Sequence, residues 1–418
     1  MKKLLSILLS AALLLALCAP ALAETGDVTI EFVQWWEPEL PEGSLRAIMD
    51  DFEAANPGIK VKLISNPFAS TRDLVVSGAA TGTLSDVVGL DGAWVNDLVN
   101  QNALLPMDAY MAADEGFNAD DVAAAVKVND ETYMFAVANF TYHLFANTQL
   151  LNGAGIEDMP KTWSEFISVC QELKAANPDA NGWDFPFSSL YASAGQDQFM
   201  TWVWATGGRM LDESGKPNFT GNEAMEKTLA FFKEAYDSGI MSAGVFSKQS
   251  QDMFEEFASG RSAFMINGLS AIASLRERNA DLVFDVVDIP VADDYEGAHG
   301  MMYAAWGIGV SASSEHPDEA WKLVSYLMSQ EVSARIAEIA NSLPGNKQAS
   351  PSSQDPAFLN GYALFQNSEL VNEFIGMPSA TELNRILMEQ VQMTLEGGHS
   401  VEDTLANIQS QWNAELGY

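Results

Sequence analysis

Cysteine is almost absent from this chain. Two cysteines occur in 418 residues, Cys18 and Cys170, and Cys18 falls within an N-terminal targeting pattern. A framework of disulfides is therefore excluded once that segment is removed. Cys170 shares one face of an expected helix with Trp163 and Phe166. We expect it to be a small buried apolar residue and not a nucleophile or a metal ligand.

Positive charge is also scarce. The chain has 21 lysines and arginines against 57 aspartates and glutamates, which gives a formal net charge of −36. Proteins that bind nucleic acid or anionic membrane surfaces present basic patches. The composition therefore disfavours both kinds of partner.

The usual catalytic and metal-binding motifs are missing. The four histidines lie far apart, and the sequence contains no H-x-x-x-H, C-x-x-C, G-x-S-x-G, G-x-G-x-x-G or Walker-type loop. We therefore expect no metal, no cofactor and no enzymatic activity. A pair of catalytic carboxylates among the acidic residues stays open as an alternative, because glycosidase pairs are defined by their distance in space.

A single long apolar run occurs, at the N-terminus. Residues 1–23 combine Lys2 and Lys3, an apolar stretch from residue 4 to 17, and an A-x-A site ending at Ala23. This pattern predicts a signal peptide cleaved after Ala23, with lipidation at Cys18 as the alternative. Removal of these 23 residues leaves 395 residues and a net charge of −38, since only two lysines are lost. That length is enough for two domains with full cores.

The mature N-terminus begins with the stretch VTIEFVQWWE, residues 28–37. Its alternating residues predict a strand that runs into Trp35 and Trp36 and ends at Glu37. Expected helices at 45–52 and 74–80 and strands at 59–63 and 86–91 follow, and the last strand delivers Asp91 and Trp94 to its carboxyl end. This β-α-β-α-β order predicts an α/β fold with a mainly parallel sheet and ligands beyond the strand ends.

Further candidate binding residues are scattered along the rest of the chain. Residues 131–147 are almost wholly apolar, which suits a long strand passing from one domain to another, and polar residues interrupt it. Two tryptophans follow in an expected helix, where we expect one to face the core and the other a cleft. The additional candidates are Asn139, Tyr142, Trp202, Trp204, Asn267, Tyr303, Trp306 and Asn341.

Together these residues favour a sugar as the ligand. Sugars present apolar C–H faces and a rim of hydroxyls, which suit flat aromatic walls with a few amides and carboxylates. Each aromatic ring taken singly is more often a core residue than a ligand contact. We expect some members of the set to line a cleft.

Several stretches resemble family 1 extracellular solute-binding proteins of bacterial ABC importers, the maltose-binding-like group. They are VTIEFVQWW, DFEAANPGIKV, SDVVGLDG, NALLPMDAYM, PKTWSEF, ATGGRMLDESGKP, FASGRSAFMING, GIGVSASSEHPDEAWKLVSYLMS and SLPGNKQA. Of these, PKTWSEF and SGRSAFMING are the most specific. Their number and order extend the resemblance over nearly the whole mature chain.

The resemblance implies two α/β lobes with a solute bound between them and closure by hinge motion. Lobe one would comprise residues 24–136 and 304–342, and lobe two residues 137–303 and 343–418, with crossings near 137–138, 303–307 and 343–344. It further implies a monomer, exported to the periplasm or cell surface, that captures an oligosaccharide and delivers it to an ABC permease. The alternatives are a receptor for another small solute such as a glycerol phosphate, a sensor-linked binding protein, and a secreted glycoside-acting enzyme.

Overall fold

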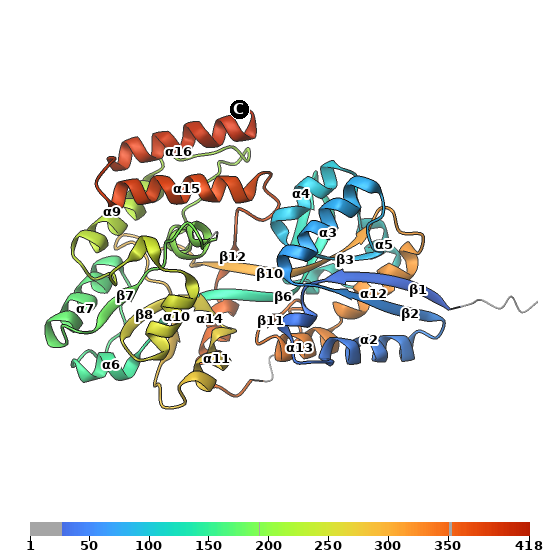
Figure 1. Ribbon diagram of the computed structural model, residues 1–418, viewed down its shortest axis with the longest axis horizontal. Helices are drawn as coiled ribbons and strands as arrows, with labels where there is room; N and C mark the ends of the chain where they lie inside the picture. The colour runs from blue at the N-terminus through green and yellow to red at the C-terminus, as the bar shows by residue number, and fades with distance from the viewer. Residues whose placement is uncertain (1–26, 192, 351–352) are drawn as a thin grey trace, which may run out of the picture.

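The computed structural model describes residues 27–191, 193–350 and 353–418. The predicted targeting segment 1–23 and Cys18 lie outside the described residues. Figure 1 shows two lobes side by side, each with strands covered by helices, and long strands passing between them. The predicted two-lobed α/β architecture is confirmed.

Lobe one contains the N-terminal part of the chain. Its sheet has the order β2-β1-β3 with all three strands parallel, as the βαβ pattern predicted. Ile30 and Phe32 of β1 point into the core and are fully buried. The elements of this lobe are β1 (Val28–Gln34), α2 (Ser44–Ala55), β2 (Ile59–Ser65), α3 (Phe68–Thr81), β3 (Val87–Leu90), α4 (Gly92–Asn100), β4 (Leu104–Leu105), α5 (Asp108–Ala113), β5 (Ala125–Val128), α12 (Pro317–Leu327) and α13 (Gln330–Ile339).

Lobe two contains the middle of the chain and the C-terminus. Its elements are α6 (Thr148–Gly153), α7 (Trp163–Ala176), β7 (Asn181–Asp184), the π-helix η4 (Gly195–Met200), α8 (Thr201–Ala205), α9 (Glu223–Asp237), α10 (Ser250–Ala258), β8 (Ser262–Gly268), α11 (Ala271–Arg278), β9 (Asp285–Val287), α14 (Pro356–Gln366), β12 (Glu369–Val371), α15 (Ala380–Leu395) and α16 (Val401–Leu416). The C-terminal helices α15 and α16 cover the top of this lobe in Figure 1.

Three strands connect the lobes: β6 (Glu131–Ala146), β10 (Gly300–Ser311) and β11 (Leu343–Pro344). β6 pairs with both of the others at one place, where Asn139 lies opposite Ala305 on one side and Leu343 on the other. The three predicted crossings therefore meet in a single hydrogen-bonded hinge.

Strand directions depart from the expected mainly parallel arrangement. Pairing is parallel in β2-β1-β3 and between β7 and β8, but β10 is antiparallel to β3, and β6 is antiparallel to β10 and β8. The reason is that β6 and β10 cross the hinge in opposite directions and each continues into the sheets of both lobes.

The hydrophobic core is divided in the same way as the lobes. One cluster contains residues between 30 and 138 and between 306 and 336, whereas two others contain residues between 144 and 302 and between 343 and 412. The predicted lobe boundaries at 303/304 and 342/343 fall between these groups, and the boundary at 136/137 lies just before the first gap. We propose these boundaries as the division of the chain into lobes.

Local sequence signals account for α7. Its N-terminus carries the expected capping box, in which Thr162 and Glu165 satisfy each other's backbone N–H groups. Cys170 of this helix is fully buried, and burial raises the pKa of its thiol, as expected for an unreactive core residue.

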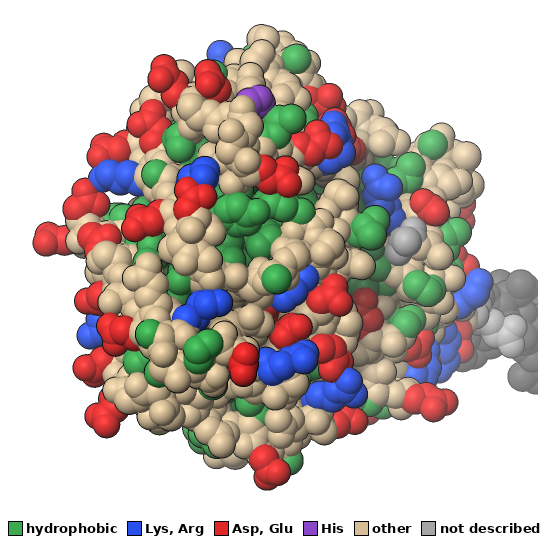
Figure 2. All heavy atoms as spheres, turned by 60° about the vertical axis from the view of Figure 1, so that its left-hand side comes forward, with side chains coloured by type: hydrophobic (Ala, Val, Ile, Leu, Met, Phe, Trp, Pro, Cys, Tyr) green, Lys and Arg blue, Asp and Glu red, His purple; other side chains and the backbone are tan. Residues whose placement is uncertain are grey.

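Acidic side chains are spread over the outer face of lobe two, interrupted by a smaller number of lysines and arginines (Figure 2). In the part of the chain that the structure describes, no helix combines the length and apolar character that crossing a bilayer requires.

Candidate functional site

A cleft of about 490 Å³ lies between the lobes, next to the hinge strands. Lobe one contributes Phe68, Arg72, Asp91, Gly92, Ala93 and Trp94, and the hinge strands contribute Tyr142, Ala304 and Ala305. Lobe two contributes Ser193, Gln196, Asp197, Asn372, Phe374, Ile375, Ala380, Thr381 and Asn384.

The lobe-one wall is built on the carboxyl end of β3. Asp91 follows this strand as the N-cap of α4, and its Oδ1 accepts a hydrogen bond from the Ala93 backbone at 2.9 Å. Burial raises the pKa of Asp91, while the Ala93 N–H and the positive charge of Arg72 oppose that rise. A helix N-terminus supplies partial positive charge that supports a carboxylate here.

Aromatic rings form the rest of that wall. The Trp94 ring lies 5.1 Å from Phe68 and 5.4 Å from Trp35 between centroids, and Trp35 and Phe68 are 5.2 Å apart. Phe68 is 41% exposed, whereas Trp35 is 3% exposed and lies behind the other two rings. The wall therefore presents Phe68 and Trp94 to the cleft and uses Trp35 as backing.

A buried carboxylate dominates the lobe-two wall. Asp197 accepts hydrogen bonds from the Tyr191 hydroxyl at 2.8 Å and the Ser193 hydroxyl at 2.7 Å, and from the Gln196 amide at 3.3 Å. Burial raises its pKa to about 6, although these hydrogen bonds and one from Tyr142 oppose the rise.

Asp197 sits in the π-helix η4, a conformation that occurs mostly as single turns and is frequent at functional sites. Tyr142 reaches the same carboxylate from hinge strand β6, and burial followed by the Asp197 charge raises the pKa of its phenol. The hinge and lobe two are thus joined by polar contacts at the wall of the cleft.

A profile of the bacterial extracellular solute-binding protein family matches residues 38–334 of the chain. The chain belongs to this family. The resemblance expected from PKTWSEF and the other stretches is therefore confirmed.

The relatives of this solute-binding protein have low sequence identity to it but match most of its length. A binding protein of Brucella abortus is 23% identical over 327 residues, 78% of each chain. The galactooligosaccharide-binding protein of Bacillus subtilis is 25% identical over 384 residues, which cover 89% of this chain and 86% of that one.

Solved structures share the fold. The cyclic α-maltosyl-1,6-maltose binding protein of Arthrobacter globiformis superposes with a TM-score of 0.80 at 17% identity, covering 94% of this chain and 99% of that one. The sugar-binding protein MalE of Xanthomonas citri gives a TM-score of 0.79 at 22% identity, with 93% and 98% covered. Both are two-lobed, as is this solute-binding protein.

The structure places three of the predicted site residues, Asp91, Trp94 and Tyr142, on the cleft. Trp35 lies behind Trp94 and Phe68. Trp36 is fully buried and stacks on Trp306 at 5.7 Å with an interplanar angle of 8°. We therefore assign Trp36 and Trp306 to the packing beneath the wall, because neither ring is among the residues that line the cleft.

Trp202 and Trp204 require a correction. We expected one of them to face the cleft, but both are 0% exposed. Trp202 packs against Phe166 and Trp183 at 5.1 and 5.0 Å, and the Trp204 indole N–H donates to Glu373 at 2.7 Å. Both diverging faces of α8 are covered within lobe two, one by α7, β7 and α9 around Trp202 and the other by Glu373 and Phe374 around Trp204.

The five remaining predicted residues lie outside the set that lines the cleft. Asn139 is buried and donates to the Pro344 carbonyl at 3.2 Å, Glu37 accepts from Ser65, and Asn267 accepts from the Gly268 N–H at 2.8 Å. Tyr303 is 8% exposed, and Asn341 is an exposed residue with φ of 48° just after α13. Asn139 fixes the hinge, and Asn341 terminates a helix in the left-handed conformation that asparagine tolerates.

Several lining residues were not singled out from the sequence. Arg72, Gln196, Asp197 and Phe374 lie on helices or in a loop, without the strand-end position that identified Asp91, and Asn372 follows the three-residue strand β12, which was not predicted from the sequence. The one available signal was the polar run Gly195–Gln198 set within apolar sequence.

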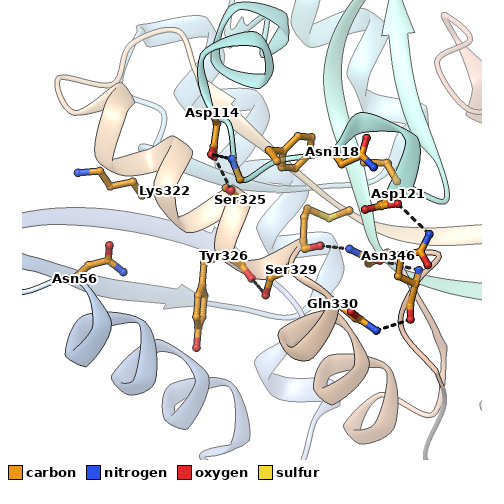
Figure 3. Close-up of a pocket in the computed structure, with 15 residues that line it drawn as sticks. Asn56, Asp114, Asn118, Asp121, Lys322, Ser325, Tyr326, Ser329, Gln330 and Asn346 are labelled. Carbon is orange, nitrogen blue, oxygen red and sulfur yellow. Dashed lines mark hydrogen bonds between the residues drawn. The ribbon is translucent and has the colours of Figure 1, made fainter.

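A second pocket, of about 480 Å³, is lined by residues of lobe one together with Asn346 and Gln348 from the segment that follows β11 (Figure 3). Its polar groups already bond one another: Asp114 accepts from Trp321 and Ser325 at 3.1 and 2.9 Å, and Gln330 donates to the Gln348 carbonyl at 2.7 Å. The residues that line this pocket are all different from those that line the interlobe cleft.

No cluster of three or more histidine, cysteine, aspartate or glutamate side chains suited to a metal occurs among the described residues. Nothing in the cleft therefore indicates a metal centre within that part of the chain.

Proposed function

We propose that this solute-binding protein captures an uncharged carbohydrate, an oligosaccharide, between its lobes and delivers it unchanged to an ABC permease. The observation that carries this proposal is the pairing of aromatic rings with desolvated carboxylates in one interlobe cleft. Rings fit the C–H faces of a sugar, and carboxylates accept hydrogen bonds from its hydroxyls.

The charges of the cleft argue against an anionic solute such as a glycerol phosphate. Among the described residues that line it, Arg72 is the one cation, and two carboxylates, Asp91 and Asp197, line the same cleft. Phosphate sites use several cations or a cluster of backbone N–H groups.

The relatives support a carbohydrate by their names, which include binding proteins for galactooligosaccharide, cyclic maltosyl-maltose and cycloalternan. Isothermal titration against linear and cyclic oligosaccharides of glucose, galactose and N-acetylglucosamine tests the proposal, with tryptophan fluorescence as a second signal. Heat from at least one oligosaccharide supports it, and no response across the panel refutes it.

Recovery of the sugar separates a receptor from an enzyme. We expect chromatography after prolonged incubation to return the bound oligosaccharide intact, and any hydrolysis product that disappears in an Asp197→Asn variant would identify a glycosidase. We further propose export through residues 1–23, with cleavage after Ala23. Intact mass of the mature protein distinguishes that site from lipidation at Cys18, and light scattering tests the proposed monomer.

A further inference from the structure

The segment Asn372–Gly376, between β12 and α15, belongs to lobe two but contacts lobe one. Asn372, Phe374 and Ile375 line the cleft. The segment is separate from the three strands that connect the lobes covalently, so its contacts with lobe one are free to form and break as the hinge moves.

Its contacts with lobe one centre on Gly92, the first residue of α4. The Gly376 N–H donates to the Gly92 carbonyl at 2.8 Å, and the Ile375 side chain packs against the core of lobe one. A Cβ atom on Gly92 would lie 2.6 Å from Ile375 Cγ2, so the two segments are as close as a glycine permits. Gly92 directly follows Asp91, which places this contact at the edge of the proposed binding site.

Glu373 fixes the segment to lobe two. Its carboxylate accepts hydrogen bonds from the Trp204 indole at 2.7 Å, from the Met210 N–H at 2.9 Å and from the Leu211 N–H at 3.0 Å. Phe374 is 2% exposed and packs against the Trp412 ring at 5.9 Å.

A third attachment reaches the hinge. The Asn372 amide donates to the Tyr303 carbonyl of β10 at 2.8 Å, and its Oδ1 accepts from the Phe374 N–H at 3.1 Å. The segment is thus held at lobe two and at the hinge while its tip rests on lobe one.

We propose that Asn372–Gly376 is a clasp that holds lobe one against lobe two beside the bound solute, and that Glu373 is the residue that positions it. The clasp contact with Gly92 favours the closed arrangement of the lobes, because opening the hinge separates Gly376 from Gly92. This inference rests on the proposed function only in naming the solute that the clasp helps to retain.

The decisive variant is Gly92→Ala. Gly92 has no positive φ, so alanine is acceptable at the first position of α4 except for its collision with Ile375. The matched control is Gly153→Ala, since a Cβ there meets nothing within 4 Å and φ is again not positive.

The test needs no solute. Spin labels are placed through Ser77→Cys on α3 and Ser410→Cys on α16, two exposed serines on opposite lobes, in a Cys18→Ser background; Cys170 is buried and does not react. Double electron–electron resonance spectroscopy then measures the distance between the two spin labels, and hydrogen exchange measures the protection of the Gly376 amide.

We expect Gly92→Ala to lengthen and broaden the distance distribution and to speed exchange at Gly376 at least about tenfold, with Gly153→Ala unchanged. Glu373→Gln replaces a carboxylate that accepts from three N–H groups with an amide, so it should also lengthen the interlobe distance and speed exchange at Gly376. Its circular dichroism spectrum should match that of the wild type. If both variants fold and both readouts match those of the wild type, the clasp is refuted.

Solute release provides an independent arm. With any oligosaccharide that binds the wild type, Gly92→Ala should raise the dissociation rate more than it lowers the association rate. A panel without any binder refutes the carbohydrate proposal, while the solute-free distances still decide the clasp.

Discussion

The two walls of the cleft are built on different principles. Lobe one presents the rings of Phe68 and Trp94 together with Asp91, whose carboxylate is partly engaged by its own helix. Lobe two presents Asp197, a carboxylate surrounded by hydroxyl and amide donors. We infer that lobe one supplies contact area and lobe two supplies directed hydrogen bonds, so that a solute is fully recognised when both lobes touch it.

The largest loss of affinity is expected for Asp197→Asn. Hydrogen bonds to charged groups contribute about 1.5–3 kcal/mol, so oligosaccharide affinity should fall roughly 10- to 100-fold. Titration calorimetry measures this loss. The exposed Asp179→Asn serves as control, and equal affinities for the two variants would remove Asp197 from the site.

Trp94→Ala is expected to have the next largest effect. Loss of one aromatic wall that stacks on a sugar should weaken binding about tenfold, consistent with the 1–3 kcal/mol range for such truncations. The fluorescence change on binding should fall as well. If affinity survives while Asp197→Asn abolishes it, lobe two alone recognises the solute.

Lowering the pH provides a third test of how the lobe-one and lobe-two walls differ. Protonation of Asp197, whose pKa burial raises to about 6, weakens its hydrogen bonds from sugar hydroxyls. Between pH 7.5 and pH 5, affinity should fall up to about tenfold in the wild type and much less in Asp197→Asn. Calorimetry at the two pH values measures the difference.

The same titration affects stability in the opposite direction. Because the folded-state pKa is raised, the contribution of Asp197 to stability is fully present below about pH 4, the unfolded value, and is lost as the pH rises through about 6. Removing this charge in Asp197→Asn should therefore raise the melting temperature more at pH 7.5 than at pH 4. Equal shifts at both pH values would contradict a desolvated carboxylate.

The smallest effect on affinity is expected for Trp202→Phe. This ring is fully buried and is packed far from solvent among the aromatic residues of lobe two. The smaller ring should reduce the free energy of unfolding by about 1–3 kcal/mol and leave oligosaccharide affinity unchanged. Thermal melts and titrations on one sample check both statements, and a large affinity loss would return Trp202 to the binding site.

The features that the sequence predicted well are those that depend on position along a strand. The alternation in Val28–Gln34 and the long apolar run of β6 identified the lobe-one sheet and the hinge, and the end of β3 identified Asp91 and Trp94. These features follow from local periodicity, which the sequence records directly.

Residue type alone was a weaker guide. Trp94 and Trp202 are equally good candidates by composition, yet one lines the cleft and the other lies in the core, because long-range packing decides which ring retains an open face. Asp197 was missed because its environment is assembled by Tyr142 and Tyr191 from different segments. No sequence period encodes that assembly.

The chain crosses between the lobes three times, and this has a consequence for folding during synthesis. The lobe-one core includes Ile336 of α13, and the lobe-two core includes Trp412 of α16. A nascent chain therefore lacks a complete core in either half until synthesis has passed residue 336, and contacts between residues hundreds of positions apart fold slowly. The topology itself therefore delays completion of either core until most of the polypeptide has been made.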